Sequence, residues 1–350
     1  MRLSLFRAAA IMLAAAIPAG CGSNSSAVGA LPAGAGMAAM RSGRVTPAGV
    51  SVKQFKIPLS GVQPDDIALG ESGNLYVSQP VGVPKTYLWQ VTEAGKITSV
   101  GSLGYTGPVG ITGYKGAVYF GLQQSSDQET LGIYYAGKLT LKRLIGPPVN
   151  AIYYLKKDKD GSIWFSNPGG YQVGHIVNGS YTTLLAPTKY CSPYGITIGP
   201  DKNVWVAEQC ATTTGRIGRI TAKGQWTEFP LPNNQQPPPG DGIIAGPDGN
   251  LWFTLDTPNI GRITTAGKIT EFPLGPSDGP GYGITVGNDK ALWYTLQQSG
   301  QIGRMTTKGS STAYATPGGG SSELTGISAG TGRTIWFTET NSGQVGRLTY

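Results

Sequence analysis

A repeat with a period of 41 to 47 residues runs through most of the chain and limits the folds that it can adopt. Seven aromatic residues mark it, each followed by an apolar residue: Tyr76-Val77, Tyr119-Phe120, Trp164-Phe165, Trp205-Val206, Trp252-Phe253, Trp293-Tyr294 and Trp336-Phe337. A turn glycine keeps the same period, at Gly95, Gly137, Gly179, Gly224, Gly267 and Gly309. Repeats of this length are typical of solenoids and propellers.

A third marker is most often the arginine of a Gly-Arg pair. The residues in this column are Trp89, Tyr135, His175, Arg219, Arg262, Arg304 and Arg347. His175 is the only histidine of the chain. Because it shares a column with arginines, we expect it to have a structural role, reaching a neighbouring repeat or solvent. A metal site made of two or three histidines is excluded by their number.

The unit from Gly242 to Leu274 shows the organisation of one repeat. It contains four short β-rich segments, joined by turns at 247–250 and at Ala266-Gly267. Glycine adopts the positive φ of such hairpin turns at little cost. Four strands in each period predict the blade of a β-propeller, so seven periods predict seven blades of four antiparallel strands.

The seventh repeat ends at Tyr350 without its fourth strand. A segment that matches this missing strand, VKQFKIPLS, lies at 52–60, before the first repeat. We therefore expect the N-terminal strand to complete the last blade and close the ring, which leaves few unpaired edges. The predicted fold is all-β, and the propeller spans residues 50–350.

The N-terminus is typical of an export signal. Arg2 and Arg7 precede an apolar run at 8–17, and Cys21 follows small residues. This pattern predicts a signal peptide at 1–20 and, after it, a Ser- and Gly-rich flexible tether at 21–49. The site resembles the lipobox of bacterial lipoproteins, which implies that Cys21 is lipidated; the alternative is a plain signal peptide cut nearby. We expect the chain outside the cytoplasm, lipid-anchored in the outer membrane or at the cell surface, or secreted.

The formal charge of +8 falls to +6 once Arg2 and Arg7 are removed with the signal peptide. The remaining basic residues are spread through the repeats, whereas a nucleic-acid or anionic membrane surface clusters them. We therefore expect no nucleic-acid partner, contact with a membrane only through the lipid anchor, and a monomeric chain.

The repeated phrases resemble those of the virginiamycin B lyase family. They are clearest at 246–254 (GPDGNLWFT), 260–265 (IGRITT) and 270–274 (TEFPL), and the resemblance covers roughly 52–350. It implies a seven-bladed propeller that opens a cyclic depsipeptide lactone by elimination, with a divalent ion such as Mg²⁺. It also implies a catalytic histidine before the Gly-Ile that opens an inner strand, a glutamate fourteen residues later, and a second histidine three residues further on.

The chain departs from that catalytic pattern. The positions before Gly-Ile or its equivalent hold Asp66, Val109, Asn150, Tyr194, Asp241, Tyr282 and Thr325, none of them histidine. The expected acid is kept only as Glu208 and Glu339, and the second histidine is replaced by Ala211 and Ser342. The acid–base pair of the family is therefore absent.

Two cysteines lie in the fourth repeat. Cys191 comes before an inner strand and Cys210 after the next, antiparallel strand, so their ends should be neighbours. Outside the cytoplasm such a pair predicts a disulfide that pins a loop at the channel mouth. Two free thiols are the alternative.

Acidic and tyrosine side chains should ring one mouth of the channel. We expect a ligand site formed by Asp65, Asp66, Tyr194, Asp241, Tyr282 and Thr325. Asp65, Asp66 and Asp241 are the candidate metal ligands, because hard cations prefer oxygen. Tyr194, Glu208, Tyr282 and Glu339 are the candidate catalytic groups, because neighbouring acids raise one another's pKa. A hydrated polar funnel without a partner is the alternative.

Three functions remain open at this point. The first is a lipid-tethered propeller that binds a small molecule or peptide at its mouth. The second is a carbon–oxygen lyase acting on a cyclic lactone with tyrosine and carboxylate groups, with Mg²⁺ if the resemblance extends to activity. The third is a structural or protein-interaction propeller.

Overall fold

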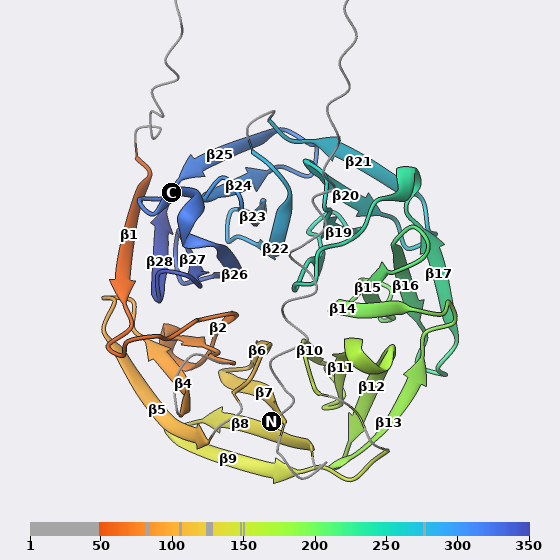
Figure 1. The fold of residues 1–350 in the computed structure, drawn as a ribbon, viewed down its shortest axis with the longest axis horizontal. Coiled ribbons are helices and arrows are strands. Elements are labelled where there is room, and N and C mark those ends of the chain that lie inside the picture. Colours follow the sequence, from red (N-terminus) through yellow and green to blue (C-terminus); the bar gives the residue numbers. More distant parts are fainter. Residues whose placement is uncertain are drawn as a thin grey trace, which may run out of the picture. The chain divides into compact units, whose positions relative to one another are not determined.

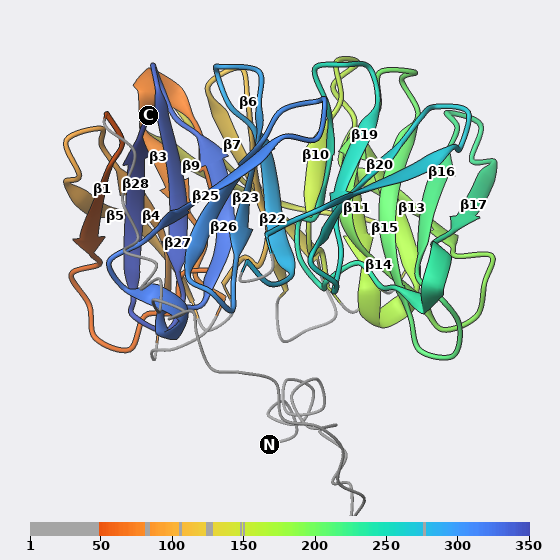
Figure 2. The ribbon, with the colours of Figure 1, turned by 90° about the horizontal axis from the view of Figure 1, so that it is seen from above.

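The computed structural model describes residues 49–80, 85–104, 107–123, 129–147, 149, 151–275 and 278–350. The signal peptide, Cys21 and nearly all of the expected tether lie outside these residues. In the described part of the chain, the strands form seven four-stranded antiparallel sheets arranged in a ring (Figure 1). The view from the side shows the sheets standing next to one another as blades (Figure 2). The predicted seven-bladed β-propeller is confirmed.

Each blade is numbered along the chain, and its first strand lies nearest the central channel. The strands are β2 (Ile67–Leu69), β3 (Leu75–Val77), β4 (Thr86–Val91) and β5 (Ile97–Gly104) in blade 1; β6 (Ile111–Tyr114), β7 (Ala117–Gln123), β8 (Glu129–Tyr135) and β9 (Lys138–Arg143) in blade 2; β10 (Leu155–Lys157), β11 (Ile163–Asn167), β12 (Gln172–Val177) and β13 (Ser180–Leu185) in blade 3; β14 (Cys191–Ile198), β15 (Val204–Cys210), β16 (Arg216–Ile220) and β17 (Trp226–Pro230) in blade 4; β18 (Ile243–Ala245), β19 (Leu251–Thr254), β20 (Asn259–Ile263) and β21 (Ile269–Pro273) in blade 5; β22 (Gly281–Val286), β23 (Leu292–Leu296), β24 (Gln301–Met305) and β25 (Ser311–Ala315) in blade 6; and β26 (Leu324–Ala329), β27 (Thr334–Glu339), β28 (Gln344–Thr349) and β1 (Ser51–Lys56) in blade 7. Four 3₁₀ turns are described: η2 (Glu71–Gly73), η3 (Pro168–Gly170), η4 (Pro232–Asn234) and η5 (Gly319–Ser322).

The N-terminal strand closes the ring as predicted. β1 pairs antiparallel with β28, from Ser51 opposite Thr349 to Lys56 opposite Gln344. The Gln54 amide also donates to both carboxylate oxygens of Glu339 on β27, at 2.7 and 2.8 Å. The first and last strands of the propeller are therefore held in one sheet.

The repeated tryptophan lies at the centre of the blade core in blades 4, 5 and 6. Trp205, Trp252 and Trp293 are fully buried. Each indole N–H donates to the aspartate of the turn before it, at 2.9 to 3.1 Å. The apolar ring is thus buried with its one polar atom satisfied, which explains why the turn repeats an aspartate at this place.

The arginine column covers the same tryptophans. Arg262 lies 5.4 Å from the Trp252 ring, and Phe272 stacks against that ring at 5.0 Å. In blade 3, His175 takes the arginine's place and stacks on Trp164 at 3.9 Å, with the rings inclined by 10°. His175 therefore lies in the arginine column, two strands outward from β10.

The first two blades differ from our alignment of that column. The residue opposite Tyr76 is Gln90, and the residue opposite Tyr119 is Ile133. We had aligned Trp89 and Tyr135 to these places. Neither blade has a Gly-Arg pair, so the sequence offered no fixed point for counting there.

The repeated turn glycine fits one blade to the next. Gly267 has φ +91°, and a Cβ built on it would lie 2.1 Å from the Phe229 ring of blade 4. Gly309 stands in the same relation to Phe272, and Gly95 to Phe55. A side chain here would push neighbouring blades apart, so the column must be glycine for reasons of space as well as backbone conformation.

Among the residues that the structure describes, no helix is long and apolar enough to cross a bilayer.

Truncating Phe55 should test the ring closure. Its ring stacks on Trp336 at 5.7 Å and fills the space above Gly95 of blade 1. We expect Phe55→Ala to lower the free energy of unfolding by about 2–3 kcal/mol, below the usual value for a fully buried phenylalanine because this ring is partly exposed. Urea unfolding measures it. Leu59→Ala, just beyond the strand, is the control and should cost less than about 1 kcal/mol; equal losses would contradict the closing role.

Candidate functional site at the channel mouth

The mouth is the end of the ring at which the inner strands begin. Threonine hydroxyls on the second strands of several blades set its geometry. Thr254 donates to the carbonyl of Tyr282 at 2.8 Å, and Thr295 donates to that of Thr325 at 3.0 Å. Thr338 donates to the carbonyl of Asp65 at 2.6 Å. Each bond joins one blade to the next, so the last residue of the Trp-Phe-Thr phrase positions the residue that faces the channel in the following blade.

Strand register identifies the equivalent mouth residue in every blade. It lies two residues before the inner-strand residue that pairs with the second aromatic column, such as Ile243 with Phe253. The seven residues are Asp65, Val109, Tyr153, Tyr194, Asp241, Tyr282 and Thr325. Our alignment had Asp66 and Asn150 in the first and third blades. Register corrects these to Asp65 and Tyr153, and Asn150 itself lies outside the described residues.

The next position is glycine in five blades, because neighbouring inner strands approach closely there. A Cβ on Gly283 would lie 2.7 Å from the Thr325 carbonyl oxygen. Blades 1 and 3 instead carry Asp66 and Tyr154. At this position, blades 1 and 3 therefore carry large polar side chains, whereas the glycines of the other five blades carry none.

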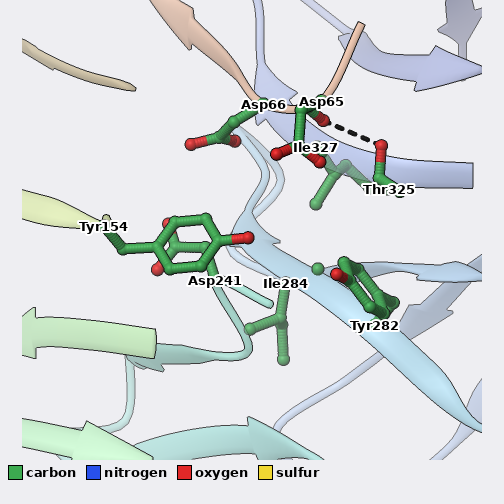
Figure 3. Close-up of a pocket in the computed structure, with 10 residues that line it drawn as sticks. Asp65, Asp66, Tyr154, Asp241, Tyr282, Ile284, Thr325 and Ile327 are labelled. Carbon is green, nitrogen blue, oxygen red and sulfur yellow. Dashed lines mark hydrogen bonds between the residues drawn. The ribbon is translucent and has the colours of Figure 1, made fainter. Parts of the chain in front are cut away.

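Together these residues enclose a small pocket. It is lined by Asp65, Asp66, Tyr154, Asp241, Tyr282, Gly283, Ile284, Thr325, Gly326 and Ile327. Figure 3 shows the acids and the two tyrosines converging on one space, with the hydroxyls of Tyr154 and Tyr282 pointing toward each other. The space between the side chains is about 10 Å³, enough for about one water molecule. Only a small polar group can enter it.

Asp241 forms the ion pair of the pocket. Its Oδ2 lies 2.7 Å from the Nζ of Lys156, which reaches over from β10. Its Oδ1 is buried and has no hydrogen-bond partner among the described residues. A buried carboxylate oxygen without a donor is costly, so this oxygen is the strongest acceptor that the pocket offers to a ligand.

Asp66 is the most buried acid of the site, with 5% of its surface exposed. Its two oxygens accept the backbone N–H of Ile67 at 2.8 Å and of Ile111 at 3.0 Å. Burial, followed by the negative charge of Asp241, raises the pKa of Asp66 to about 8, although Lys156 and both N–H groups act in the other direction. Asp66 is therefore protonated at neutral pH.

Two tyrosines complete the wall. Burial raises the pKa of Tyr154, and Tyr282 and the three acids raise it further. Burial also raises the pKa of Tyr282, whose hydroxyl donates to the Pro239 carbonyl at 3.0 Å. Both phenols therefore stay protonated and act as hydrogen-bond donors or acceptors, not as bases.

The acids do not fit a divalent ion well. One oxygen of Asp241 already pairs with Lys156, and both oxygens of Asp66 face backbone N–H groups. Within the described ranges, no group of three or more His, Cys, Asp or Glu side chains is placed to hold a metal. We therefore derive no step through Mg²⁺.

The structure does not bring all the predicted site residues together. Tyr194 occupies the mouth position of blade 4 but does not line the pocket; it packs against Tyr153. Glu208 and Glu339, which we expected to face the channel, are fully buried inside their blades. Successive side chains of a strand point to opposite faces, so the residue after the mouth-directed Thr338 must face the preceding blade.

These two glutamates occupy equivalent places with different partners. Glu339 accepts from Gln54, which lies opposite Gly346. In blade 4 the corresponding partner, opposite Gly218, is Glu228. Burial and then the Glu228 charge raise the pKa of Glu208 well above its usual range, while Trp226 donates to its Oε1 at 3.2 Å.

The cysteines of blade 4 are joined. A disulfide links Cys191 and Cys210, which lie directly opposite each other on β14 and β15. It ties the start of the inner strand to the end of the second strand, at the mouth.

Our sequence reasoning missed Tyr154 and Lys156. A signal for both was present, because the inner-strand residue precedes its partner in the second aromatic column by ten residues in six blades, as Ile196 precedes Val206. Counting back from Phe165 gives Leu155, which has Tyr154 and Lys156 on either side.

Comparison with known proteins agrees with this geometry. The model of the virginiamycin B lyase family matches residues 25–215 and 210–350. A streptogramin B lyase structure is 27% identical, with a TM-score of 0.72 over 86% of this chain and 98% of that one. The selenomethionine-substituted virginiamycin B lyase of Staphylococcus aureus is 28% identical, with a TM-score of 0.71 over 86% and 99%.

Two further structures also match the chain, one a variant of a lyase and the other a propeller that shares only the fold. A catalytically inactive histidine-to-alanine variant of the S. aureus enzyme, with quinupristin, is 27% identical, with a TM-score of 0.70 over 86% and 99%. The WD40 propeller of Doa1, at 13% identity and a TM-score of 0.65, shares the fold alone. No curated protein matches the chain significantly.

Ring and pocket thus define a seven-bladed propeller with a polar pocket at one mouth. The repeat phrases, the family model and the lyase structures agree on its relationship: the chain belongs to the virginiamycin B lyase family. Its single histidine lies in the arginine column, outside the pocket.

The pair of equivalent glutamates gives a matched test. The raised pKa of Glu208 means that its contribution to stability is complete below the unfolded value of about 4.5 and is lost as pH rises toward the folded value. We expect the unfolding midpoint of Glu208→Gln to exceed that of the native chain at pH 8 by roughly 2–4 °C, with the difference vanishing near pH 4. Thermal unfolding across this range measures it.

Glu339→Gln is the control for that experiment. The substitution places the new glutamine amide against the amide of Gln54 in blade 7, so it should lower the unfolding midpoint at every pH. The same response in both variants would contradict the raised pKa of Glu208 in blade 4.

Proposed function

We propose that this chain is an exported, lipid-anchored propeller that binds a small molecule or peptide at its channel mouth without cleaving it. The observation that carries the proposal is the Asp241 carboxylate, with one oxygen on Lys156 and the other buried without a donor. A hydroxyl, amide or ammonium group of a ligand would supply the missing hydrogen bond. The pocket admits only that group, so the rest of the ligand must lie on the mouth face.

The absence of histidine from the pocket supports binding without lyase chemistry. The S. aureus lyase is described as catalytically inactive when one histidine is changed to alanine. In this chain the mouth positions carry tyrosine, aspartate, threonine and valine, and none carries histidine. The base that would remove a proton from the substrate has no counterpart of the same kind.

One observation favours the alternative of an active lyase. Asp66, with a pKa of about 8, lies beside Asp241, and such a pair can give and take a proton near neutral pH. In that case Asp241 would be the base and the neutral Asp66 the acid. One probe, quinupristin, distinguishes binding from lyase activity.

Quinupristin is the probe for the mouth. We expect it to raise the unfolding midpoint of the native chain, since a probe at 100 times its Kd stabilises by about 2.7 kcal/mol. Chromatography should show no linear product. Asp241→Asn should abolish the shift, whereas Glu93→Gln, an exposed acid elsewhere, should keep it. No shift in the native chain would contradict binding, and a linear product would establish the lyase instead.

Cys21 is the proposed anchor, and residues 8–17 the apolar core of its export signal. Expressed in a bacterium, the native chain should fractionate with membranes and incorporate labelled palmitate. Cys21→Ser should lose the label and move to the soluble extracytoplasmic fraction, because the substitution removes the whole lipid anchor from the chain. Ser23→Ala is the control. A soluble, unlabelled native chain would contradict lipidation.

A further inference from the structure

Four tyrosines lie beside the pocket at the mouth, and we call them the tyrosine surface: Tyr153, Tyr171, Tyr190 and Tyr194. Tyr153 and Tyr194 hold the mouth positions of blades 3 and 4, and their rings meet at 6.4 Å and 84°. Tyr171 follows η3 and Tyr190 precedes β14; their rings meet at 6.0 Å and 81°. Each pair therefore presents two ring faces at nearly a right angle.

The backbone holds two of these rings in an uncommon conformation. Tyr171 has φ +55° and Tyr190 has φ +60°, in the left-handed region that bulky residues rarely adopt. The Tyr171 carbonyl accepts from Ala186 at 2.8 Å, and that of Tyr190 accepts from Ala211 at 3.0 Å, next to the disulfide. The fold thus fixes two rings that are 36% and 54% exposed. Strain of this kind collects at binding sites.

The surface is continuous with the pocket. η3, directly before Tyr171, packs against β14, which carries Tyr194, and the Tyr194 ring meets that of Tyr153. Around the ring, Tyr153, Tyr194, Asp241 and Tyr282 occupy the same position in four successive blades. A ligand that reaches Asp241 Oδ1 therefore has aromatic rings on both sides.

The charge of the site selects the kind of ligand. Three carboxyl groups, those of Asp65, Asp66 and Asp241, line the pocket against one ammonium group, that of Lys156, so the lining stays net negative even with Asp66 protonated. Lys156 is already held by Asp241. Lys189, next to Tyr190 in the chain, opposes this negative charge, so a cation is held best toward the Asp241 end. Ring faces also attract cations, and clustered aromatic rings form the cages that hold alkylated ammonium groups.

We infer that the tyrosine surface and Asp241 bind a substituted ammonium group of the ligand. The inference rests on the proposed function, because it names the chemical class of the ligand at the same mouth. The rings supply cation–π attraction and apolar contact to the alkyl groups, and Asp241 supplies the opposite charge.

Choline and its neutral isostere 3,3-dimethylbutan-1-ol test the inference, because they differ only in charge. By titration calorimetry on the full chain, we expect choline to bind at least about tenfold more tightly than the isostere. Tyr190→Leu and Tyr194→Leu should each weaken choline binding by roughly 3- to 10-fold, and Asp241→Asn by a similar factor. Tyr194→Phe keeps the ring and should bind almost as well as the native chain.

Tyr135→Leu is the matched control, since Tyr135 is also 54% exposed but lies at the end of β8. It should leave choline binding unchanged, and thermal unfolding checks that every variant is folded. Equal binding of choline and the isostere, or equal loss in Tyr135→Leu, would overturn the inference. If choline fails while quinupristin still gives its Asp241-dependent shift, the ammonium site is wrong and the proposed function stands. If both probes fail, both are wrong.

Discussion

The stacking of tryptophan between a turn aspartate and an arginine or histidine is the interaction on which this ring depends. Asp248 accepts the indole N–H of the fully buried Trp252, and Arg262 and Phe272 pack against its ring. Glycine at the turn of the next blade then lets that blade approach the outer aromatic ring. The conserved-looking phrases of the repeat therefore describe the core and the joints between blades, and carry no information about the ligand.

This explains why the fold was predictable and the site only in part. The aromatic, glycine and arginine columns fix blade number, strand order and the closing strand, because each column is required by packing. The mouth residues lack such a requirement, so the count slipped by one in blade 1 and by more in blade 3, where Asn150 was chosen instead of Tyr153. Glu208 and Glu339 were placed at the mouth because spacing along a strand does not reveal which face a side chain takes.

The polar pocket arises from two exceptions to a packing rule. Neighbouring inner strands approach so closely that five blades need glycine one residue after the mouth position. Asp66 and Tyr154 break the rule in blades 1 and 3, and they form the pocket with Asp241 and Tyr282. Departures from a local rule are expected at functional sites, where stability is given up for chemistry. Here the departure yields a buried acid with a raised pKa beside an ion pair.

The mouth can change its chemistry because the ring is tied through backbone atoms there. Thr254, Thr295 and Thr338 bond to carbonyl oxygens of the mouth residues, so these three ties do not depend on the side chain that the mouth residue carries. A histidine at such a position can therefore be replaced without losing them. In this chain the mouth side chains add ties of their own: Thr325 donates to the Asp65 carbonyl at 2.8 Å, and Tyr282 donates to that of Pro239 at 3.0 Å. The ring thus rests on a backbone frame that stays the same while the side chains at the mouth can differ between members of the family.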